Sequence, residues 1–214
     1  MTDTLDAQPA APLGRRERNK IKVMARLYEA AISLFAEQGY DETSIDEIAE
    51  RADVARGTFF NYFQRKEDLL CVWGEKRRDT LLATMAADGV VPDCAVGRLR
   101  HCMTALAQIN EAHRHETNAL LMAWVRAGRP LLEDPYLADL FAEVVAGGVE
   151  SGEFRSCFTA EQIGHALRDL YLGTLYRWCG QPEEPADRLT GELLTTLDLI
   201  LQGILVDRPP EPAS

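Results

Sequence analysis

The stretch from Ser44 to Phe63 constrains the fold of this chain most, because its pattern fits two short helices joined by a tight turn. Ser44 and Glu47 stand three residues apart, so each can bond a free backbone N–H of the other in a capping box. The apolar positions of the first helix repeat at helical spacing, at Ile45, Ile48 and Ala49. This pattern predicts a helix that begins at Ser44.

The second helix of this stretch is predicted to have one buried face and one exposed polar face. Phe59 and Phe63 stand four residues apart and therefore share the inward side. The opposite side presents Arg56, Thr58, Asn61 and Tyr62. Arg, Asn and Thr side chains can bond base edges, and a short rigid helix fits the major groove. The stretch is therefore interpreted as a helix-turn-helix that reads DNA.

Residues 20–70 resemble the N-terminal domain of TetR-family transcriptional regulators. Five motifs in the family's order and spacing carry the resemblance: Ala30–Tyr40, Thr43–Ile45, Ile48–Ala52, Gly57–Phe63 and Lys66–Leu70. One departure is Gln64-Arg65, which stands where a Pro or Ser usually opens the fourth helix. It changes a local helix cap and leaves the expectation of DNA binding intact.

Nine residues are expected to contact DNA: Thr43, Ser44, Arg56, Gly57, Thr58, Phe60, Asn61, Tyr62 and Lys66. Arg56 and Asn61 suit base edges or phosphates, whereas Thr58 and Tyr62 offer hydroxyls to phosphates. Lys66 is expected at the start of the fourth helix, where free N–H groups and the helix dipole favour a phosphate. Thr43 and Ser44 hold the matching position at the second helix.

Several of these residues have a second interpretation. Gly57 either lets the backbone approach DNA closely or is a simple turn glycine. Phe60 either packs against a thymine methyl or belongs to the core, and Tyr62 can be a partly buried ring. Arg56 and Asn61 can also be ordinary surface residues.

The formal net charge of −11 is unusual for a DNA-binding protein, but the charge is unevenly distributed. Residues 1–66 are nearly neutral, and the excess of acid lies in residues 67–214. Five basic side chains fall close together, at Arg15, Arg16, Arg18, Lys20 and Lys22. Charges are screened beyond roughly 8 Å at physiological salt, so this segment can bind DNA while the acidic body stays away. The alternative is a disordered, solvated arm.

The remaining composition indicates a cytoplasmic protein. Five cysteines are scattered along the chain, which favours reduced thiols over a disulfide framework. No run of apolar residues reaches the ~20 that a membrane-spanning helix needs. The first residues lack a charged segment followed by an apolar one, so no signal peptide is expected.

The whole chain is expected to be all-α, with about nine helices, because no β-alternation of useful length appears. We expect flexible tails at residues 1–14 and 207–214. Between them we expect a three-helix helix-turn-helix domain at 15–65 and a helical effector and dimerisation domain at 66–206. Gly147-Gly148 is among the expected helix breaks.

The last two helices, roughly Thr159–Cys179 and Ala186–Val206, are the most apolar. They either pack within the chain or form a four-helix bundle with a second copy, which the resemblance implies. A homodimer could read two halves of a palindromic operator. The expected interface residues are Leu167, Tyr171, Leu175, Leu193, Leu197, Ile200 and Ile204.

The resemblance also implies a C-terminal cavity for a small-molecule effector, which is expected to be largely apolar. Candidate lining residues are Trp73, Met103, Leu106, Asn110, Trp124, Phe141 and Tyr171. Each of these also suits an ordinary core position. The expected function is a ligand-responsive transcriptional repressor that needs no cofactor.

The sequence disfavours the alternatives to this function. Metal sensing is disfavoured because His101, Cys102, His113 and His115 lack metal-ligand spacing. Redox sensing is disfavoured because no neighbouring residue marks Cys94 or Cys157 as a reactive thiolate. An enzyme or a pure dimerisation module is disfavoured because common catalytic motifs are missing and a DNA-reading set of side chains is present.

Overall fold

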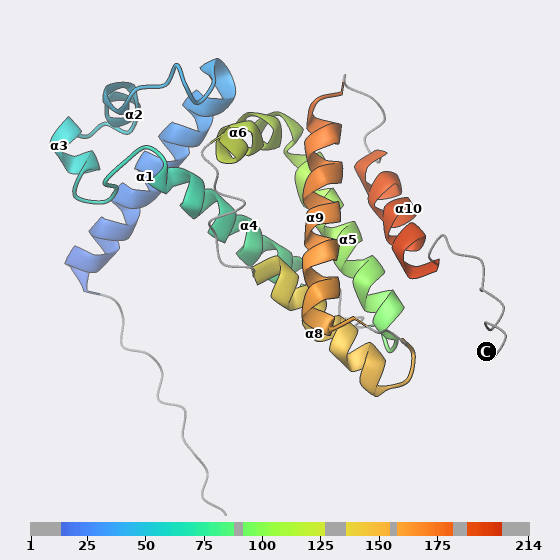
Figure 1. Ribbon diagram of the computed structural model, residues 1–214. Coiled ribbons are helices and arrows are strands. Elements are labelled where there is room, and N and C mark those ends of the chain that lie inside the picture. The colour runs from blue at the N-terminus through green and yellow to red at the C-terminus, as the bar shows by residue number, and fades with distance from the viewer. Residues whose placement is uncertain (1–13, 88–91, 127–135, 155–157, 182–187, 203–214) are drawn as a thin grey trace, which may run out of the picture. The chain divides into compact units, whose positions relative to one another are not determined.

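The computed structural model describes residues 14–87, 92–126, 136–154, 158–181 and 188–202 (Figure 1). Within these ranges the chain forms nine helices and no strand, which confirms the all-α prediction. The chain divides into two compact units between Leu69 and Leu70. None of the helices in the described ranges is long and apolar enough to span a bilayer.

The first unit contains α1 (Arg15–Gln38), α2 (Ile45–Arg51), α3 (Arg56–Phe59) and the first residues of α4 (Asp68–Ala87). α1 ends at Gly39, which adopts a positive φ of 91° and donates its N–H to the Phe35 carbonyl. The capping box predicted at the start of α2 is present, with Ser44 and Glu47 bonded reciprocally. Local signals therefore place these helix ends correctly.

The core of the first unit is built from apolar side chains of α1, α2 and α3. Its most buried members are Leu27, Ala31, Phe35, Ile48 and Phe59. On the surface, Arg51 of α2 binds the Glu37 carboxylate of α1 through two hydrogen bonds of 2.8 and 2.9 Å. These bonds, with a further one from Ser33, hold the pKa of Glu37 down at about 2. The packing and this pair orient α2, and hence the turn that presents α3.

The second unit contains most of α4 and five further helices: α5 (Ala95–Ala112), α6 (Arg114–Arg126), α8 (Tyr136–Glu150), α9 (Ala160–Cys179) and α10 (Arg188–Gln202). α9 packs on α8, α6 and α10, and α10 also packs on α5 (Figure 1). Gly164 of α9 permits a close approach to α8, since a Cβ there would lie 2.3 Å from the Ala138 carbonyl oxygen. That glycine therefore serves packing within the chain.

The helix break expected at Gly147-Gly148 is wrong, because α8 continues through both residues. A Cβ on Gly148 would lie 2.4 Å from a ring carbon of Phe154 and 2.8 Å from the Ala95 side chain. Tertiary packing therefore uses this glycine inside a helix. α8 ends instead at Glu150, ahead of Gly152, which has a positive φ of 77°. Of the expected tails at 1–14 and 207–214, only Gly14 lies within the described residues, where it caps the start of α1.

Candidate DNA-binding surface and ligand cavity

α3 is a single helical turn whose orientation is set by two buried aromatic rings. Phe59 and Phe63 are 0% and 4% exposed, and their ring centroids lie 5.5 Å apart. The N–H groups of Tyr62 and Phe63 bond the Phe59 carbonyl at 2.9 Å, so the chain stays tightly wound after the helix. This arrangement leaves Arg56, Gly57 and Asn61 exposed, with Thr58 and Tyr62 half-buried beside them. The contacts of these residues with DNA remain a prediction.

Phe60 and Arg56 form a small cluster on the exposed side of α3. The ring of Phe60 is 46% exposed, which excludes the interpretation of this residue as core. The Arg56 guanidinium lies 5.9 Å from the Phe60 ring centroid and also pairs with Asp46 of α2. Both partners of that ion pair are 60% exposed, so the pair contributes little to stability. A DNA phosphate or base can therefore displace Asp46 at small cost.

Gly57 is required neither by backbone conformation nor by packing within the chain. It lies inside α3, and the described glycines with positive φ are Gly39 and Gly152. A Cβ built on Gly57 would meet no atom within 4 Å. The interpretation as a turn glycine is therefore wrong. Close approach to DNA at Gly57 stays a prediction.

Gly57→Ala is expected to weaken operator binding about tenfold, or about 1.4 kcal/mol, because the added methyl group holds the α3 backbone away from DNA. The same change should stabilise the free protein by roughly 0.5–1 kcal/mol, since alanine favours a helix over glycine. Fluorescence anisotropy and thermal unfolding measure the two effects. Gly191→Ala is the matched control, because Gly191 lies in α10 with equally open surroundings. If Gly57→Ala binds DNA as the control does, α3 does not approach DNA closely.

Lys66 and Thr43 are both engaged in hydrogen bonds within the chain, and their contact with phosphate stays a prediction. The Lys66 ammonium donates to the carbonyls of Tyr40 and Thr43 at 2.5 and 2.8 Å and lies 4.2 Å from the Tyr40 ring centroid. Burial lowers the pKa of Lys66, against the opposing effect of acidic neighbours such as Asp41. Thr43 is buried and donates its hydroxyl to the Gly39 carbonyl at 2.7 Å. Both side chains therefore hold the turn between α1 and α2.

The fourth helix starts later than the sequence predicted, and a side chain bonds the turn before it. α4 begins at Asp68, two residues later than predicted. The Asp68 carboxylate accepts the N–H groups of Gln64 and Arg65 at 2.8 and 2.9 Å and so holds the turn that precedes the helix. Ser44 is exposed, but its hydroxyl is engaged with Glu47 in the capping box of α2.

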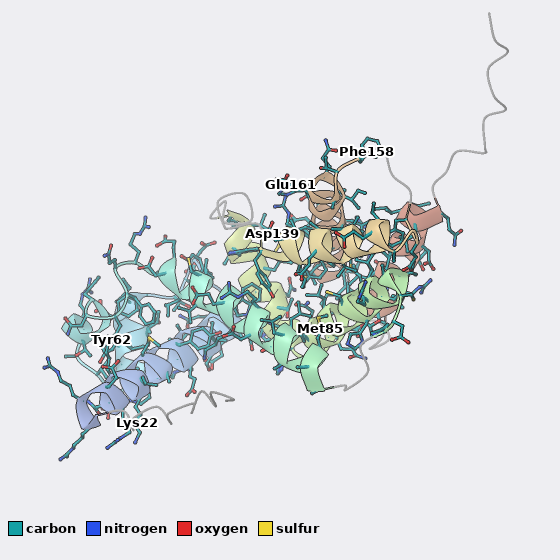
Figure 2. All side chains as sticks on the ribbon, turned by 90° about the horizontal axis from the view of Figure 1, so that it is seen from below. Lys22, Tyr62, Met85, Asp139, Phe158 and Glu161 are labelled. Atoms are coloured by element: carbon teal, nitrogen blue, oxygen red, sulfur yellow. The ribbon has the colours of Figure 1, made fainter. Side chains whose placement is uncertain are left out.

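The basic segment near the N-terminus is helical. Residues 15–22 form the first two turns of α1 and all are exposed. Long side chains project from these turns around Lys22, on the same unit as Tyr62 (Figure 2). A rigid helix presents these cations in fixed positions, which favours phosphate contacts over a solvated arm.

The second unit encloses a cavity of about 300 Å³. Its walls include five of the residues expected to line it: Trp73, Leu106, Asn110, Trp124 and Tyr171. Met103 and Phe141 do not line this cavity and are completely buried in the core, so their expected placement is wrong. Ligand contact by the other five remains a prediction.

The cavity also has three arginines that the sequence interpretation missed: Arg77, Arg78 and Arg168. Arg77 stands four residues after Trp73, on the same side of α4, which was a usable signal of a polar group on an inward face. Arg78 lies 4.9 Å from the ring centroid of Tyr136, and Arg168 binds the adjacent Asp169. A cavity with apolar walls and several guanidinium groups suits an amphiphilic anion.

The residues expected at a dimer interface mostly face the interior of the chain. Five of them are at most 7% exposed: Leu167, Tyr171, Leu175, Leu193 and Leu197. Ile200 is 40% exposed, and Ile204 lies outside the described residues. The apolar stripes of α9 and α10 therefore bury themselves against neighbouring helices of the same chain. The expected interface is wrong for these five residues.

The described cysteines and histidines do not strengthen the metal or redox alternatives. No group of three or more His, Cys, Asp or Glu side chains gathers at one place in the described ranges. Burial raises the pKa of Cys102 to about 12 and that of Cys179 to about 11. Both are therefore thiols at neutral pH, whereas the thiolate is the reactive form. Cys157 lies outside the described residues.

Comparisons with known proteins agree with this architecture. The family model described as "Bacterial regulatory proteins, tetR family" matches residues 27–71. The HTH-type transcriptional repressor KstR of Mycobacterium tuberculosis is 28% identical over 202 residues, covering 91% of this chain and 83% of that protein. A putative TetR-family regulator from Syntrophomonas wolfei aligns with a TM-score of 0.74 at 20% identity, over 89% of this chain and 100% of the other, which supports the fold.

Thermus thermophilus FadR, a TetR-family transcriptional repressor solved in complex with lauroyl-CoA, is 32% identical to this chain, with a TM-score of 0.64. The alignment covers 89% of this chain and 100% of FadR. The match therefore includes the helical second unit as well as the helix-turn-helix. The chain is a DNA-binding transcriptional regulator and belongs to the TetR family.

Proposed function

We propose that this regulator represses transcription as a homodimer and is released from its operator by an acyl thioester of coenzyme A. The observation that carries the proposal is the cavity of the second unit, which combines apolar walls with arginine side chains. The Thermus FadR complex with lauroyl-CoA supports the ligand class, since that protein is 32% identical over 89% of this chain.

The cavity suits the two chemically different halves of an acyl-CoA. Its aromatic and aliphatic walls, which include Trp124, Leu121 and Leu175, can bury an alkyl chain. Arg78 is exposed and Arg168 half-buried, so both can meet the phosphates of the nucleotide part. A volume of about 300 Å³ is at the lower end for ligand sites, which favours a medium acyl chain.

α4 offers a route from ligand to DNA because it belongs to both units. The helix begins at Asp68 in the first unit, and seven of its residues between Cys71 and Leu81 line the cavity. A ligand that binds the DNA-free conformation more tightly lowers operator affinity by the same coupling free energy. At 1–3 kcal/mol this coupling corresponds to a roughly 5–150-fold change.

The dimer that we propose uses the outward faces of α9 and α10. Large apolar side chains remain exposed there: Tyr176 at 48%, Leu199 at 55% and Ile200 at 40%. A second copy would cover these side chains and place two recognition helices on one palindromic operator. Tyr176 and Leu199 thus join Ile200, which the sequence had named, in place of the five buried residues.

Lauroyl-CoA is expected to release the protein from DNA cloned from just upstream of its own gene. In fluorescence anisotropy, saturating lauroyl-CoA should lower operator affinity about 5–150-fold, whereas free CoA should leave it unchanged. Arg78→Gln with Arg168→Gln should require more lauroyl-CoA for the same release. Operator binding that persists with every acyl-CoA from eight to eighteen carbons would overturn the proposed effector and leave the DNA-binding function standing.

A further inference from the structure

Four polar side chains from four helices, Arg77, Thr117, Asn110 and Tyr171, form a hydrogen-bonded network beside the cavity. Arg77 of α4 donates to the Thr117 hydroxyl of α6 at 2.9 Å. The Thr117 hydroxyl donates to Asn110 Oδ1 of α5 at 3.4 Å, and Asn110 Nδ2 donates to the Tyr171 hydroxyl oxygen of α9 at 3.0 Å. Asn110, Thr117 and Tyr171 are at most 7% exposed. The network ends at the hydroxyl of Tyr171, which lines the cavity.

The direction of every hydrogen bond in this network follows from which groups can donate. A guanidinium only donates, so the Thr117 oxygen accepts from Arg77 and its own proton is left for Asn110. The Asn110 amide cannot be turned around, because Nδ2 also donates to the Leu106 carbonyl at 2.6 Å and a carbonyl only accepts. The second N–H of Asn110 therefore points to Tyr171.

Tyr171 consequently uses its oxygen as an acceptor and keeps an unused proton. Among the described residues, the bond from Asn110 is the only hydrogen bond to this hydroxyl, and no acceptor receives its O–H. Burial raises the pKa of Tyr171 to about 12, so the proton stays on the oxygen at neutral pH. Buried donors in native proteins normally have a partner, which makes this O–H a place for an external acceptor.

The same network should make the Tyr171 hydroxyl a better donor than an isolated phenol. The positive charge of Arg77 polarises the Thr117 hydroxyl, which polarises the Asn110 amide, which in turn polarises Tyr171. Hydrogen bonds arranged head to tail in a low-dielectric interior strengthen one another. Arg77 also donates to the Ile109 carbonyl at 2.8 Å, which fixes the charged end of the network in place.

We infer that Tyr171 recognises a carbonyl oxygen on the part of the effector that enters the cavity. The inference rests on the proposed function, in which this cavity holds an acyl-CoA. It adds that the pocket selects for an oxygen function as well as for an apolar chain. The carbonyl is either that of the thioester or a keto group farther along the acyl chain, and both offer Tyr171 the same acceptor.

The test compares three dodecyl ligands that differ in the carbonyl. These are dodecanoyl-CoA, S-dodecyl-CoA, in which a methylene replaces the carbonyl, and S-(2-oxododecyl)-CoA, in which the carbonyl is one carbon farther from sulfur. Their affinities are measured calorimetrically with the full-length protein, with Tyr171→Phe and with Tyr28→Phe. Tyr28 is the matched control, because it is buried to the same degree as Tyr171 but lies in α1 of the first unit and does not line the cavity.

Tyr171→Phe is expected to weaken the ligand with the matching carbonyl about tenfold and to leave S-dodecyl-CoA unchanged. Tyr28→Phe should change none of the three. Because Tyr171→Phe leaves one buried N–H of Asn110 without an acceptor, the variant should melt below the native protein, and unchanged affinity for S-dodecyl-CoA shows that its cavity is intact. Loss for dodecanoyl-CoA assigns the thioester carbonyl, and loss for the oxo ligand alone assigns a keto group.

Equal binding of the thioester and thioether ligands by the native protein, with no effect of Tyr171→Phe on any ligand, would overturn this inference and leave the acyl-CoA proposal intact. That comparison needs only the native protein for its first half, so it does not depend on how the variant folds. If none of the three ligands binds the native protein, the proposed effector class fails and this inference fails with it.

Discussion

Leu197→Asp is expected to unfold the second unit and not to yield folded monomers. Leu197 is 0% exposed in the single chain, so the substitution removes a buried side chain and puts a carboxylate in its place. Loss of the leucine alone costs about 2–5 kcal/mol, and an unpaired buried carboxylate adds to this cost. Because whole domains have a stability of only about 5–15 kcal/mol, the variant should melt far below the native protein. Circular dichroism during heating measures this effect.

Ile200→Asp is the companion variant that separates folding from dimerisation. Ile200 lies three residues farther along α10 and is 40% exposed, so a charge there remains in contact with water. We expect a folded protein that sediments as a monomer, because the charge would be buried only in the dimer. A Leu197→Asp protein with native melting would show that α10 packs differently. Dimers of Ile200→Asp at native affinity would move the interface away from this face.

Lys66→Met is expected to lower both stability and operator affinity without changing the salt dependence of binding. Methionine keeps the apolar stem but leaves the carbonyls of Tyr40 and Thr43 without the ammonium. Hydrogen bonds to a charged group contribute about 1.5–3 kcal/mol, so the turn before α2 should loosen. A phosphate ligand would behave differently, since each phosphate contact adds about 0.9 to the slope of log affinity against log salt.

Lys22→Met provides the opposite pattern for comparison. Lys22 is exposed on the first turns of α1, where it is free of the turn that Lys66 holds. Its loss should make the salt slope shallower and leave the melting temperature unchanged. Operator binding measured between 50 and 200 mM salt, with melting curves, separates the two roles. Should Lys66→Met instead behave like Lys22→Met, Lys66 contacts phosphate as the sequence alone predicts.

The sequence alone was sufficient where a structure depends on neighbours a few residues apart. The capping box at Ser44 and Glu47 and the inward pair Phe59 and Phe63 were both predicted correctly. Each depends on backbone donors or side-chain directions within one or two helical turns. The family resemblance had the same origin, because its motifs fall within one short segment.

The tertiary structure decided everything that depends on which distant surface meets a given side chain. Helical periodicity shows that Leu197 lies on an apolar stripe, and only the packed chain shows that helices of the same molecule cover it. Lys66 likewise has carbonyl partners 23 and 26 residues away, where a local interpretation expected phosphate. The polar network that ends at Tyr171 joins four helices, and no spacing along the sequence predicts it. Periodicity reports that a face is buried, whereas the partner that buries it is chosen by packing of the whole unit.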